Sequence, residues 1–321
     1  MINIRKESFS APSCIDLVNG EQTSDPVAIA NAFNNFFSTI GHKVQEKVYS
    51  SHNHFSRYLQ NPNDHSFFAS PTCPNEIADL ISDFDRNKAC GPNSIPVHIL
   101  LLLKTEISKL LSDLINLSFA SGRYPDSLKI AEIIPAFKKG SRLSVNNYRP
   151  ISLLSNINKI FEKLMFNRLY NFLNLHSCIY DLQFGFRSQH STVHTLISIT
   201  EKIREALDKG HFACGIFLDL KKAFDTVDHK ILLKKLEYYG VRGTTNKWFT
   251  SYLSDRKQLV SINGFKSNLH QINIGVPQGS VLGPLLFLIY INDLHSCVKK
   301  STVHHFSDDT NLLNINNNKP C

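Results

Sequence analysis

The sequence predicts an α+β fold for this chain of 321 residues. Three kinds of pattern lead to that prediction: apolar residues at helical spacing indicate helices, short apolar runs indicate strands, and an Asn-Gly pair between two such runs indicates a β-hairpin. Because 42% of the residues are hydrophobic, the chain can bury a large core. We therefore expect more than one subdomain.

The first predicted helix begins at Asp25-Pro26, a favoured sequence for a helix start, and ends near Gly41. Its apolar face consists of Ile29, Phe33, Phe36, Phe37 and Ile40. The segment 42–70 is rich in Ser, Asn and His and is predicted to be a linker. Residues 1–70 are therefore expected to form an N-terminal helix and linker.

Two more helices are predicted within residues 71–128, which are expected to form a helical extension. One opens at Pro74, and the other runs from about 97 to 120 and stops at Gly122. The apolar residues of the first are Ile77, Leu80, Ile81 and Phe84. The third predicted unit comprises residues 129–321.

The third unit contains both strands and helices. A strand is expected at 130–137, and helices are expected at 156–173 and 192–207. A further helix should open at Asp228, because aspartate is a favoured N-cap residue. This mixture continues the α+β pattern.

A β-hairpin is expected from strands 258–262 and 270–274, joined through Asn263-Gly264. Two apolar runs, 99–103 and 281–291, are shorter than the about 20 residues that a membrane span requires. We therefore predict that both are buried core helices and that the protein has no membrane partner.

Three aspartates indicate where chemistry takes place. Asp308 and Asp309 are adjacent, Asp219 lies upstream, and short apolar runs of the length of central strands precede Asp219 and Asp308. Strands that end side by side would bring these carboxylates together. Neighbouring carboxylates repel each other unless they are neutralised, and Mg²⁺ is the natural candidate, since one or two carboxylates plus substrate phosphates usually hold it. An isolated Asp-Asp pair would more often be a solvated turn.

Six short motifs follow one another along the chain. They are Phe137-Lys138-Lys139-Gly140, Asn147-Tyr148-Arg149-Pro150, Gln183-Phe184-Gly185-Phe186-Arg187, Leu218-Asp219-Leu220-Lys221-Lys222-Ala223-Phe224-Asp225, Val276-Pro277-Gln278-Gly279 and Phe306-Ser307-Asp308-Asp309. From about residue 25 to 313, the chain resembles the reverse transcriptase domain of non-LTR (LINE-type) retrotransposons, most of all the jockey-like group. The resemblance implies a right-hand polymerase fold with palm and fingers. It also implies an RNA-directed DNA polymerase that adds dNTPs to a DNA primer on an RNA template.

By this resemblance, Asp219 and Asp308 would be metal ligands of the palm. Asp309 would lie beside them as the third catalytic aspartate, and the carbonyl group of Leu220 is a further candidate ligand. Two Mg²⁺ ions, or Mn²⁺ in their place, would activate the primer 3′-hydroxyl and neutralise the triphosphate. Ser307 stands where the family usually has alanine.

Two motifs would contact the nucleotide itself. Phe224 stands where reverse transcriptases place a ring beneath the incoming sugar, which would exclude a 2′-hydroxyl; the alternative is an aromatic side chain packed in the core. Gln278 and Gly279 belong to a segment that contacts the nascent base pair and the dNTP in the family. As sequence alone, Pro-x-Gly indicates only a loop.

Basic residues gather upstream of the motifs that contain Phe224 and Gln278. Five basic residues and only one acidic residue, Glu132, lie in this stretch: Lys129, Lys138, Lys139, Arg142 and Arg149. Arginine makes planar, bidentate phosphate contacts and lysine provides a mobile point charge. We therefore assign Arg149 and one of Lys138 and Lys139 to the triphosphate. A solvated loop without a partner is the alternative. The formal net charge of +8 agrees with binding to a phosphate backbone.

The chain departs from the family pattern in several places. Asn93 replaces the usual aspartate in a segment ahead of the fingers, and only twelve residues follow Asp309. The later palm motifs, the thumb and an endonuclease domain are therefore expected to be missing. The alternative to a working polymerase is a truncated, inactive relic that retains only nucleic-acid binding. A third hypothesis, a nucleotidyl cyclase with a palm fold, disagrees with the segments around Arg149 and Gln278.

Other features concern the compartment. The first residues, 1–6, lead into polar sequence and do not form a secretory signal. Seven cysteines are scattered without a Cys-x-x-Cys pair, which supports neither a zinc site nor a disulfide framework. We expect an intracellular retroelement ribonucleoprotein, nuclear or cytoplasmic and not secreted. The sequence predicts no oligomeric state.

Overall fold

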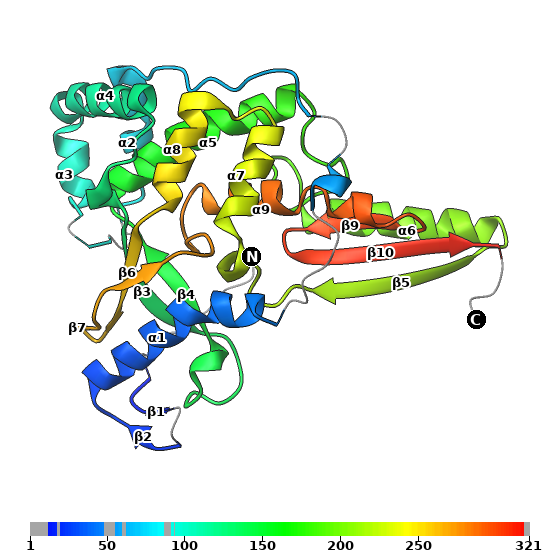
Figure 1. Cartoon of the computed structure of the whole chain (residues 1–321), viewed down its shortest axis with the longest axis horizontal. Helices are drawn as coiled ribbons and strands as arrows, with labels where there is room; N and C mark the ends of the chain where they lie inside the picture. The colour runs from blue at the N-terminus through cyan, green and yellow to red at the C-terminus, as the bar shows by residue number, and fades with distance from the viewer. Residues whose placement is uncertain are drawn as a thin grey trace.

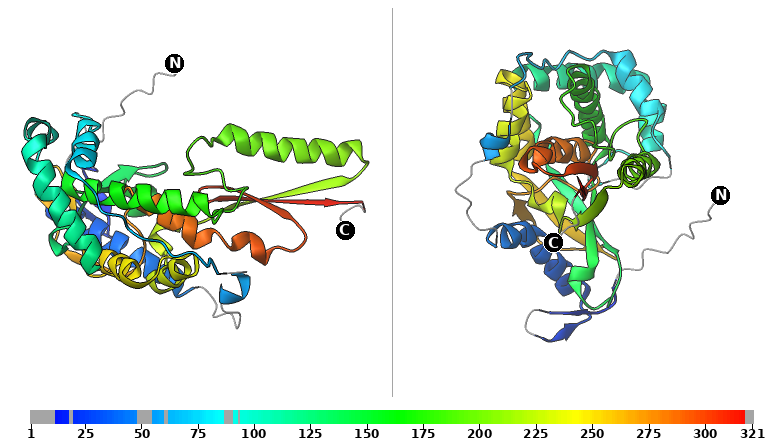
Figure 2. Two further views of the ribbon diagram at one scale, coloured as in Figure 1. Left: turned by 90° about the horizontal axis from the view of Figure 1, so that it is seen from above. Right: turned by 90° about the vertical axis from the view of Figure 1, so that its right-hand side faces the viewer.

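The computed structural model describes residues 12–17, 20–47, 55–59, 62–86, 91–92 and 94–317. Figure 1 shows a body of helices, a sheet below it, and a second sheet that projects to one side together with helix α6 (Thr192–Asp208). The turned view in Figure 2 shows the same projection from above. Asn93, one of the departures from the family pattern, lies outside the described residues.

Helix α1 (Pro26–Gln45) begins where the sequence predicts. The side chain of Asp25 accepts a hydrogen bond from the backbone N–H of Ala28 at 2.9 Å, as an N-cap does. The predicted end near Gly41 is wrong, because the helix continues past it. A Cβ atom at Gly41 would lie 2.2 Å from the backbone oxygen of Asp225, so glycine serves a close approach of α1 to that loop rather than a helix end.

Helix α2 (Pro74–Ser82) begins as predicted but ends before Phe84, and the single helix predicted for 97–120 is two helices. They are α3 (Val97–Leu102) and α4 (Lys104–Ser121). Between them Leu103 has φ −102° and ψ 20°, a conformation outside the helical range that interrupts the run. Helical spacing of apolar residues on both sides of Leu103 concealed this break.

The two apolar runs predicted to be buried behave differently. In 99–103, Leu100 is buried but Leu102 is 76% exposed, because α3 turns only one face to the core; burial of the whole run was a wrong prediction. In 281–291, helix α9 (Gly283–Ile291) is buried on nearly all sides, as predicted. Among the described residues, no helix combines the length and apolar character that a bilayer span needs.

The larger hydrophobic core lies among helices α5 (Asn156–Leu175), α7 (His229–Tyr238), α8 (Gly243–Leu253) and α9. Trp248 of α8 is completely buried there. Asp228 caps α7, since its side chain accepts hydrogen bonds from two backbone N–H groups of the first turn, which confirms the predicted helix start. These helices form the centre of the body in Figure 1.

A buried carboxylate joins three of these helices. Glu162 of α5 is inaccessible to solvent. It accepts a hydrogen bond from the hydroxyl group of Tyr252 in α8 at 2.7 Å and another from the backbone N–H of Val281 at 2.6 Å. Glu162 therefore fixes the segment from which α9 begins.

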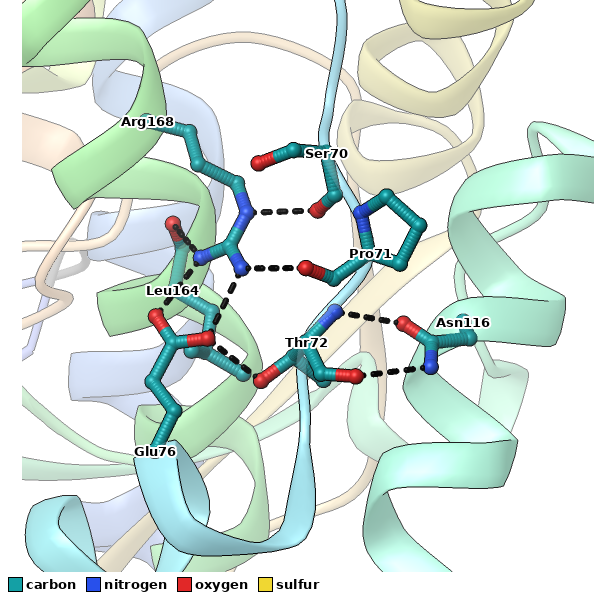
Figure 3. A network of polar contacts seen from close by, with 7 residues as sticks. All are labelled: Ser70, Pro71, Thr72, Glu76, Asn116, Leu164 and Arg168. Atoms are coloured by element: carbon teal, nitrogen blue, oxygen red, sulfur yellow. Dashed lines mark hydrogen bonds and ion pairs between the residues drawn. The ribbon is translucent and has the colours of Figure 1, made fainter.

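A second polar network ties the segment before α2 to the helical body (Figure 3). Arg168 of α5 donates hydrogen bonds to two backbone oxygens in 70–71 and forms an ion pair with Glu76 at 2.8 Å. Thr72 exchanges two backbone hydrogen bonds with the side chain of Asn116 in α4. Helices α2, α4 and α5 are thus connected through one extended segment.

The lower sheet has the strand order β4-β3-β6-β7, and β8 also pairs with β6. Its strands are β3 (Ile130–Phe137), β4 (Tyr148–Leu153), β6 (Arg256–Ile262), β7 (Phe265–Lys266) and β8 (His270–Ile272). Strand β3 has the predicted bounds, and it pairs with β4 antiparallel and with β6 parallel. Helix α1 packs against this sheet, and the short hairpin of β1 (Ile15–Asp16) and β2 (Gln22–Thr23) precedes α1 (Figure 1).

The predicted hairpin in this sheet is confirmed only in part. Asn263 and Gly264 form the turn, with positive φ angles of 51° and 85°, but the turn joins β6 to the short β7. Ser267 then bonds to Val260 through both its backbone N–H and its hydroxyl group, which interrupts the ladder. Strand β8 resumes pairing farther along β6.

The projecting sheet contains β5 (Phe212–Asp219), β10 (Asp309–Asn316) and β9 (Thr302–Phe306) in that order, and α6 (Thr192–Asp208) lies along it. The prediction that the runs before Asp219 and Asp308 are central strands is wrong, because β10 lies in the centre and β5 and β9 form the edges. Phe217 of β5 is 74% exposed. An apolar run predicts a strand but does not say how many neighbours that strand has.

Candidate functional site

Strand pairing brings the three aspartates to one end of the projecting sheet. Asp219 and Asp309 are Cα partners in the antiparallel pair of β5 and β10. Asp308 lies in the two-residue turn between β9 and β10, so the predicted final hairpin is confirmed. Ser307 precedes it in the turn with a φ of 61°, a left-handed conformation that is uncommon for non-glycine residues.

The motif that begins at Gln183 holds this turn in place. The side-chain oxygen of Gln183 accepts hydrogen bonds from the backbone N–H of Gly185 at 2.9 Å and of Ser307 at 3.3 Å. Phe184 donates its backbone N–H to the carbonyl oxygen of His305. A Cβ atom at Gly185 would lie 2.0 Å from the nitrogen of Ser307, so only glycine permits this contact. The motif therefore stabilises the turn that carries Asp308.

A cavity of about 590 Å³ lies beside the turn. Seven of the residues selected from the sequence line it: Lys138, Arg149, Asp219, Leu220, Phe224, Gln278 and Asp308. The lining also includes aromatic and basic residues to which the sequence assigned no role, although each stands in one of the six motifs: Tyr148, Phe186, Lys221 and Lys222. The two lysines could have been found from their position directly after Asp219-Leu220, and the two aromatic residues only from their place in a motif.

Three predicted site residues lie away from this cavity wall. Asp309 lines a separate hollow on the α6 side of the sheet, whereas Asp219 borders both hollows. Lys139 is exposed, and Lys138 is the lysine of that pair at the cavity. Gly279, with a φ of 115°, allows its loop to approach the oxygen of Ser152, which would lie 2.7 Å from a Cβ atom. Gly279 therefore determines how closely its loop lies to β4.

Cationic side chains gather on one wall of the cavity. Lys222 is partly buried, and burial lowers its pKa because the charged form loses hydration. Asp225 opposes that shift, whereas Lys138, Lys221 and Arg149 lower the pKa further by repulsion. Such a cluster of like charges favours an anionic ligand such as a triphosphate.

Two of the five upstream basic residues have other partners. Lys129 is buried and forms an ion pair with Asp126 at 2.8 Å. The guanidinium group of Arg142 lies 4.7 Å from the centre of the Phe137 ring. The upstream charge therefore divides between structural contacts and the cavity.

Phe224 has features of both roles considered for it. Its ring lines the cavity, and it also stacks on Phe287 of the core helix α9 with 4.8 Å between the ring centres. Phe186 meets the same ring edge-on at 5.9 Å. Packing from two sides fixes a ring that still faces the cavity.

Asp225, the next residue, contacts the Gln278 motif. Its Oδ1 accepts a hydrogen bond from Nε2 of Gln278 at 2.9 Å. Burial raises the pKa of Asp225 from its ordinary 3.8 to about 6, although the bond from Gln278 and the charge of Lys222 favour the ionised form. The folded chain thus holds a carboxylate at some cost in stability.

Replacement of Asp225 by asparagine should increase stability at neutral pH. The folded pKa lies above the unfolded value, so the native state loses stability as the pH rises from about 4 to 6, in total by about 3 kcal/mol. The Asp225→Asn variant keeps an acceptor oxygen for Gln278 and removes the buried charge. Urea unfolding at pH values from 4 to 8 would measure the difference. Asp228→Asn is the matched control, since asparagine also caps helices; equal stability of Asp225→Asn and wild type at pH 8 would contradict the prediction.

The donor set at the cavity suits Mg²⁺. Asp219 and Asp308 supply carboxylate oxygens, and Leu220 lies at the same wall. In the part of the chain that the structure describes, no three His, Cys, Asp or Glu side chains form a group that could hold a metal ion. Two carboxylates that line the same cavity as the cationic cluster nevertheless fit the ion, since substrate phosphates usually complete its coordination shell.

Comparison with known proteins gives consistent matches. A family model described as reverse transcriptase (RNA-dependent DNA polymerase) matches residues 137–319. The chain is 33% identical over 271 residues to the RNA-directed DNA polymerase from mobile element jockey of Drosophila melanogaster, covering 80% of this chain and 29% of the relative. It is 31% identical over 312 residues to the probable RNA-directed DNA polymerase from transposon BS of the same species, covering 93% and 34%. The chain therefore spans about a third of the length of these curated relatives.

The matched region includes all six motifs, from Phe137 to the turn that carries Asp308. It also contains every cavity-lining residue that the sequence selected. The resemblance to jockey-like reverse transcriptases is thus confirmed. Since the family model covers more than half of its length, the chain belongs to the reverse transcriptase (RNA-dependent DNA polymerase) family.

Proposed function

We propose that this chain is an RNA-directed DNA polymerase domain that adds dNTPs to the 3′ end of a DNA primer on an RNA template. One observation supports this function above all: a single cavity joins the carboxylates of Asp219 and Asp308 to the cations of Lys138, Arg149 and Lys222. Carboxylates and cations that line one cavity are the combination of groups that phosphoryl transfer from a triphosphate requires. In this assignment the projecting sheet is the palm, and the sheet of β3 and β4 belongs to the fingers.

Asp219 and Asp308 would hold two divalent cations, Mg²⁺ or Mn²⁺, with the carbonyl oxygen of Leu220 as a further donor. Such ions make the primer 3′-hydroxyl a better nucleophile and neutralise charge on the triphosphate. Asp309, the partner of Asp219 across the strands, would complete the acidic end of the sheet. Gln183 keeps Asp308 in position by holding the turn.

The cationic wall would bind the triphosphate. Arg149 offers two parallel donors and Lys138 a mobile charge, which makes Lys138 the preferred lysine of the pair with Lys139. Lys221 and Lys222 add charge to the same cluster. Gln278 would contact the nascent base pair, and Gly279 would allow its loop to lie close to β4.

Phe224 would select deoxynucleotides through its ring. Replacement of Phe224 by alanine is expected to lower discrimination against ribonucleotides by about 10–100-fold, because removing the ring leaves room for a 2′-hydroxyl. The ratio of kcat/KM for a dNTP and the matching rNTP measures this effect. Phe265→Ala, on the exposed strand β7, is the control. Unchanged discrimination in Phe224→Ala would assign the residue to core packing alone.

Template-dependent primer extension tests the proposed function. The chain is incubated with a DNA primer on an RNA template, dNTPs and MgCl₂, and products are resolved by length. Extension that follows the template sequence supports the polymerase. Retention of nucleic acid without extension supports the inactive relic, and nucleotide turnover without a template supports a different phosphotransferase.

A further inference from the structure

Gln278 lies between two hollows of the molecule. One is the cavity lined by Asp219 and Asp308, which we call the nucleotide cavity, and the other, the inner cavity, has a volume of about 50 Å³ and is lined by residues of α1 and the lower sheet. Asp225 lines the inner cavity, and its Oδ1 accepts a hydrogen bond from Nε2 of Gln278, which lines both cavities. We propose that Asp225 is a positioning residue that sets the orientation of the Gln278 amide at the nucleotide cavity and thereby the affinity for the incoming dNTP. This inference rests on the proposed polymerase function.

The backbone around the pair is fixed independently of the two side chains. Val276 donates its N–H to the carbonyl oxygen of Phe224 at 2.9 Å, and Gly275 donates to that of Val227 at 2.8 Å. The carbonyl oxygen of Gln278 accepts a hydrogen bond from Ser152 of β4 at 2.7 Å. Two loops distant in the sequence are therefore held side by side by their backbones. The hydrogen bond from Gln278 to Asp225 then fixes the orientation of the Gln278 side chain.

The chemistry of the two groups determines which way the amide faces. An ionised carboxylate only accepts hydrogen bonds, so Gln278 must turn its NH₂ group toward Asp225. The amide oxygen is then the side-chain acceptor that Gln278, a residue of the cavity lining, would offer to the nucleotide. A glutamine without this anchor could present either its oxygen or its NH₂ group to the nucleotide.

Asp225 is held from the side of Gln278. Its second oxygen, Oδ2, is buried and has no hydrogen-bond partner among the residues that the structure describes. Lys222, on its own loop, is the charged group that acts on Asp225, and Arg256 and Lys257 line the same inner cavity. Packing alone does not explain an aspartate at position 225, since an apolar residue would fill the space without the cost of desolvation. The hydrogen bond from Gln278 does explain it, because that bond requires an acceptor.

A double-mutant cycle tests the inference. KM and kcat for dNTP incorporation, and the dissociation constant of a fluorescent mant-dNTP in the presence of MgCl₂, are measured for wild type, Asp225→Ala, Gln278→Ala and the double variant. Asp225→Ala should raise KM and the dissociation constant about tenfold with little change in kcat, the effect of one hydrogen bond. The same change in the Gln278→Ala background should have no further effect, because the residue acts through Gln278.

Two further variants separate positioning from general destabilisation. Asp225→Asn keeps an acceptor oxygen and should stay within about threefold of wild type in KM. Asp228→Ala removes the N-cap of α7 and lowers stability, but it should leave KM unchanged. An increase in KM for Asp228→Ala equal to that for Asp225→Ala would overturn the inference, as would additive effects in the cycle.

The binding measurement distinguishes failure of the inference from failure of the proposed function. If the wild type binds the mant-dNTP without extending a primer, the polymerase function fails, and the cycle in dissociation constants still decides the role of Asp225. If the wild type extends primers and the effects are additive, only the inference fails. A wild type that neither binds nor extends overturns both.

Discussion

Replacement of Asp308 by asparagine is expected to lower the rate of nucleotide addition by about 10³-fold, because it removes a negative charge that would hold the divalent cations in the transition state. Asp308 lines the cavity in a turn held by Gln183, so the substitution changes the charge without disturbing a helix or the core. Single-turnover incorporation of one dNTP on an RNA template, at saturating MgCl₂, measures the effect. Asp219→Asn should lose activity to a similar extent.

Asp309 offers a matched control in the same hairpin. Its side chain lines the hollow on the α6 side rather than the cavity, so Asp309→Asn should reduce the rate much less than Asp308→Asn. Unchanged extension in Asp308→Asn would contradict the metal assignment. Equal losses at Asp308 and Asp309 would instead mean that both carboxylates act at the same ions.

The largest expected effect on stability follows from replacing Glu162 by alanine. The substitution leaves the hydroxyl group of Tyr252 and the N–H of Val281 buried without their acceptor and also creates a cavity in the core. Two unsatisfied polar groups at about 1–3 kcal/mol each predict a loss of about 2–6 kcal/mol in the free energy of unfolding. Urea denaturation measured by circular dichroism would give this value.

Glu201 is the matched control for Glu162. It lies on the exposed face of α6 and pairs with Arg204 at 2.7 Å, an arrangement that typically contributes at most about 1 kcal/mol. A loss in Glu162→Ala no larger than in Glu201→Ala would show that the buried carboxylate does not hold the start of α9. Glu162→Gln should lie between the two, because it keeps one acceptor oxygen.

The sequence by itself determined the local elements and the family. Asp25 and Asp228 cap helices where capping chemistry predicts, Asn263-Gly264 forms a turn, and the bounds of β3 match its apolar run. These outcomes depend on residues adjacent in the chain, whose backbone preferences and hydrogen bonds are short-range. The order of the motifs is likewise sufficient to identify the reverse transcriptase family, because it is a property of the chain itself.

Local patterns also failed in identifiable places. The helix predicted for 97–120 breaks at Leu103, and α1 continues past Gly41 because the glycine serves a contact with Asp225. The same apolar spacing is compatible with one helix or with two. Whether a glycine ends a helix or permits a close contact depends on the backbone that packs against it.

Only the tertiary structure decided which charged groups share the cavity. It placed Lys138 and Lys222 at the cavity wall and buried Lys129 against Asp126. It also joined Asp225 to Gln278 across 53 residues of sequence. Burial and electrostatic partners arise from segments that meet only on folding, and desolvation then fixes the pKa values and the cost of each charge. A sequence therefore identifies the groups that carry the chemistry, but their orientation and their neighbours follow from the packing of distant segments.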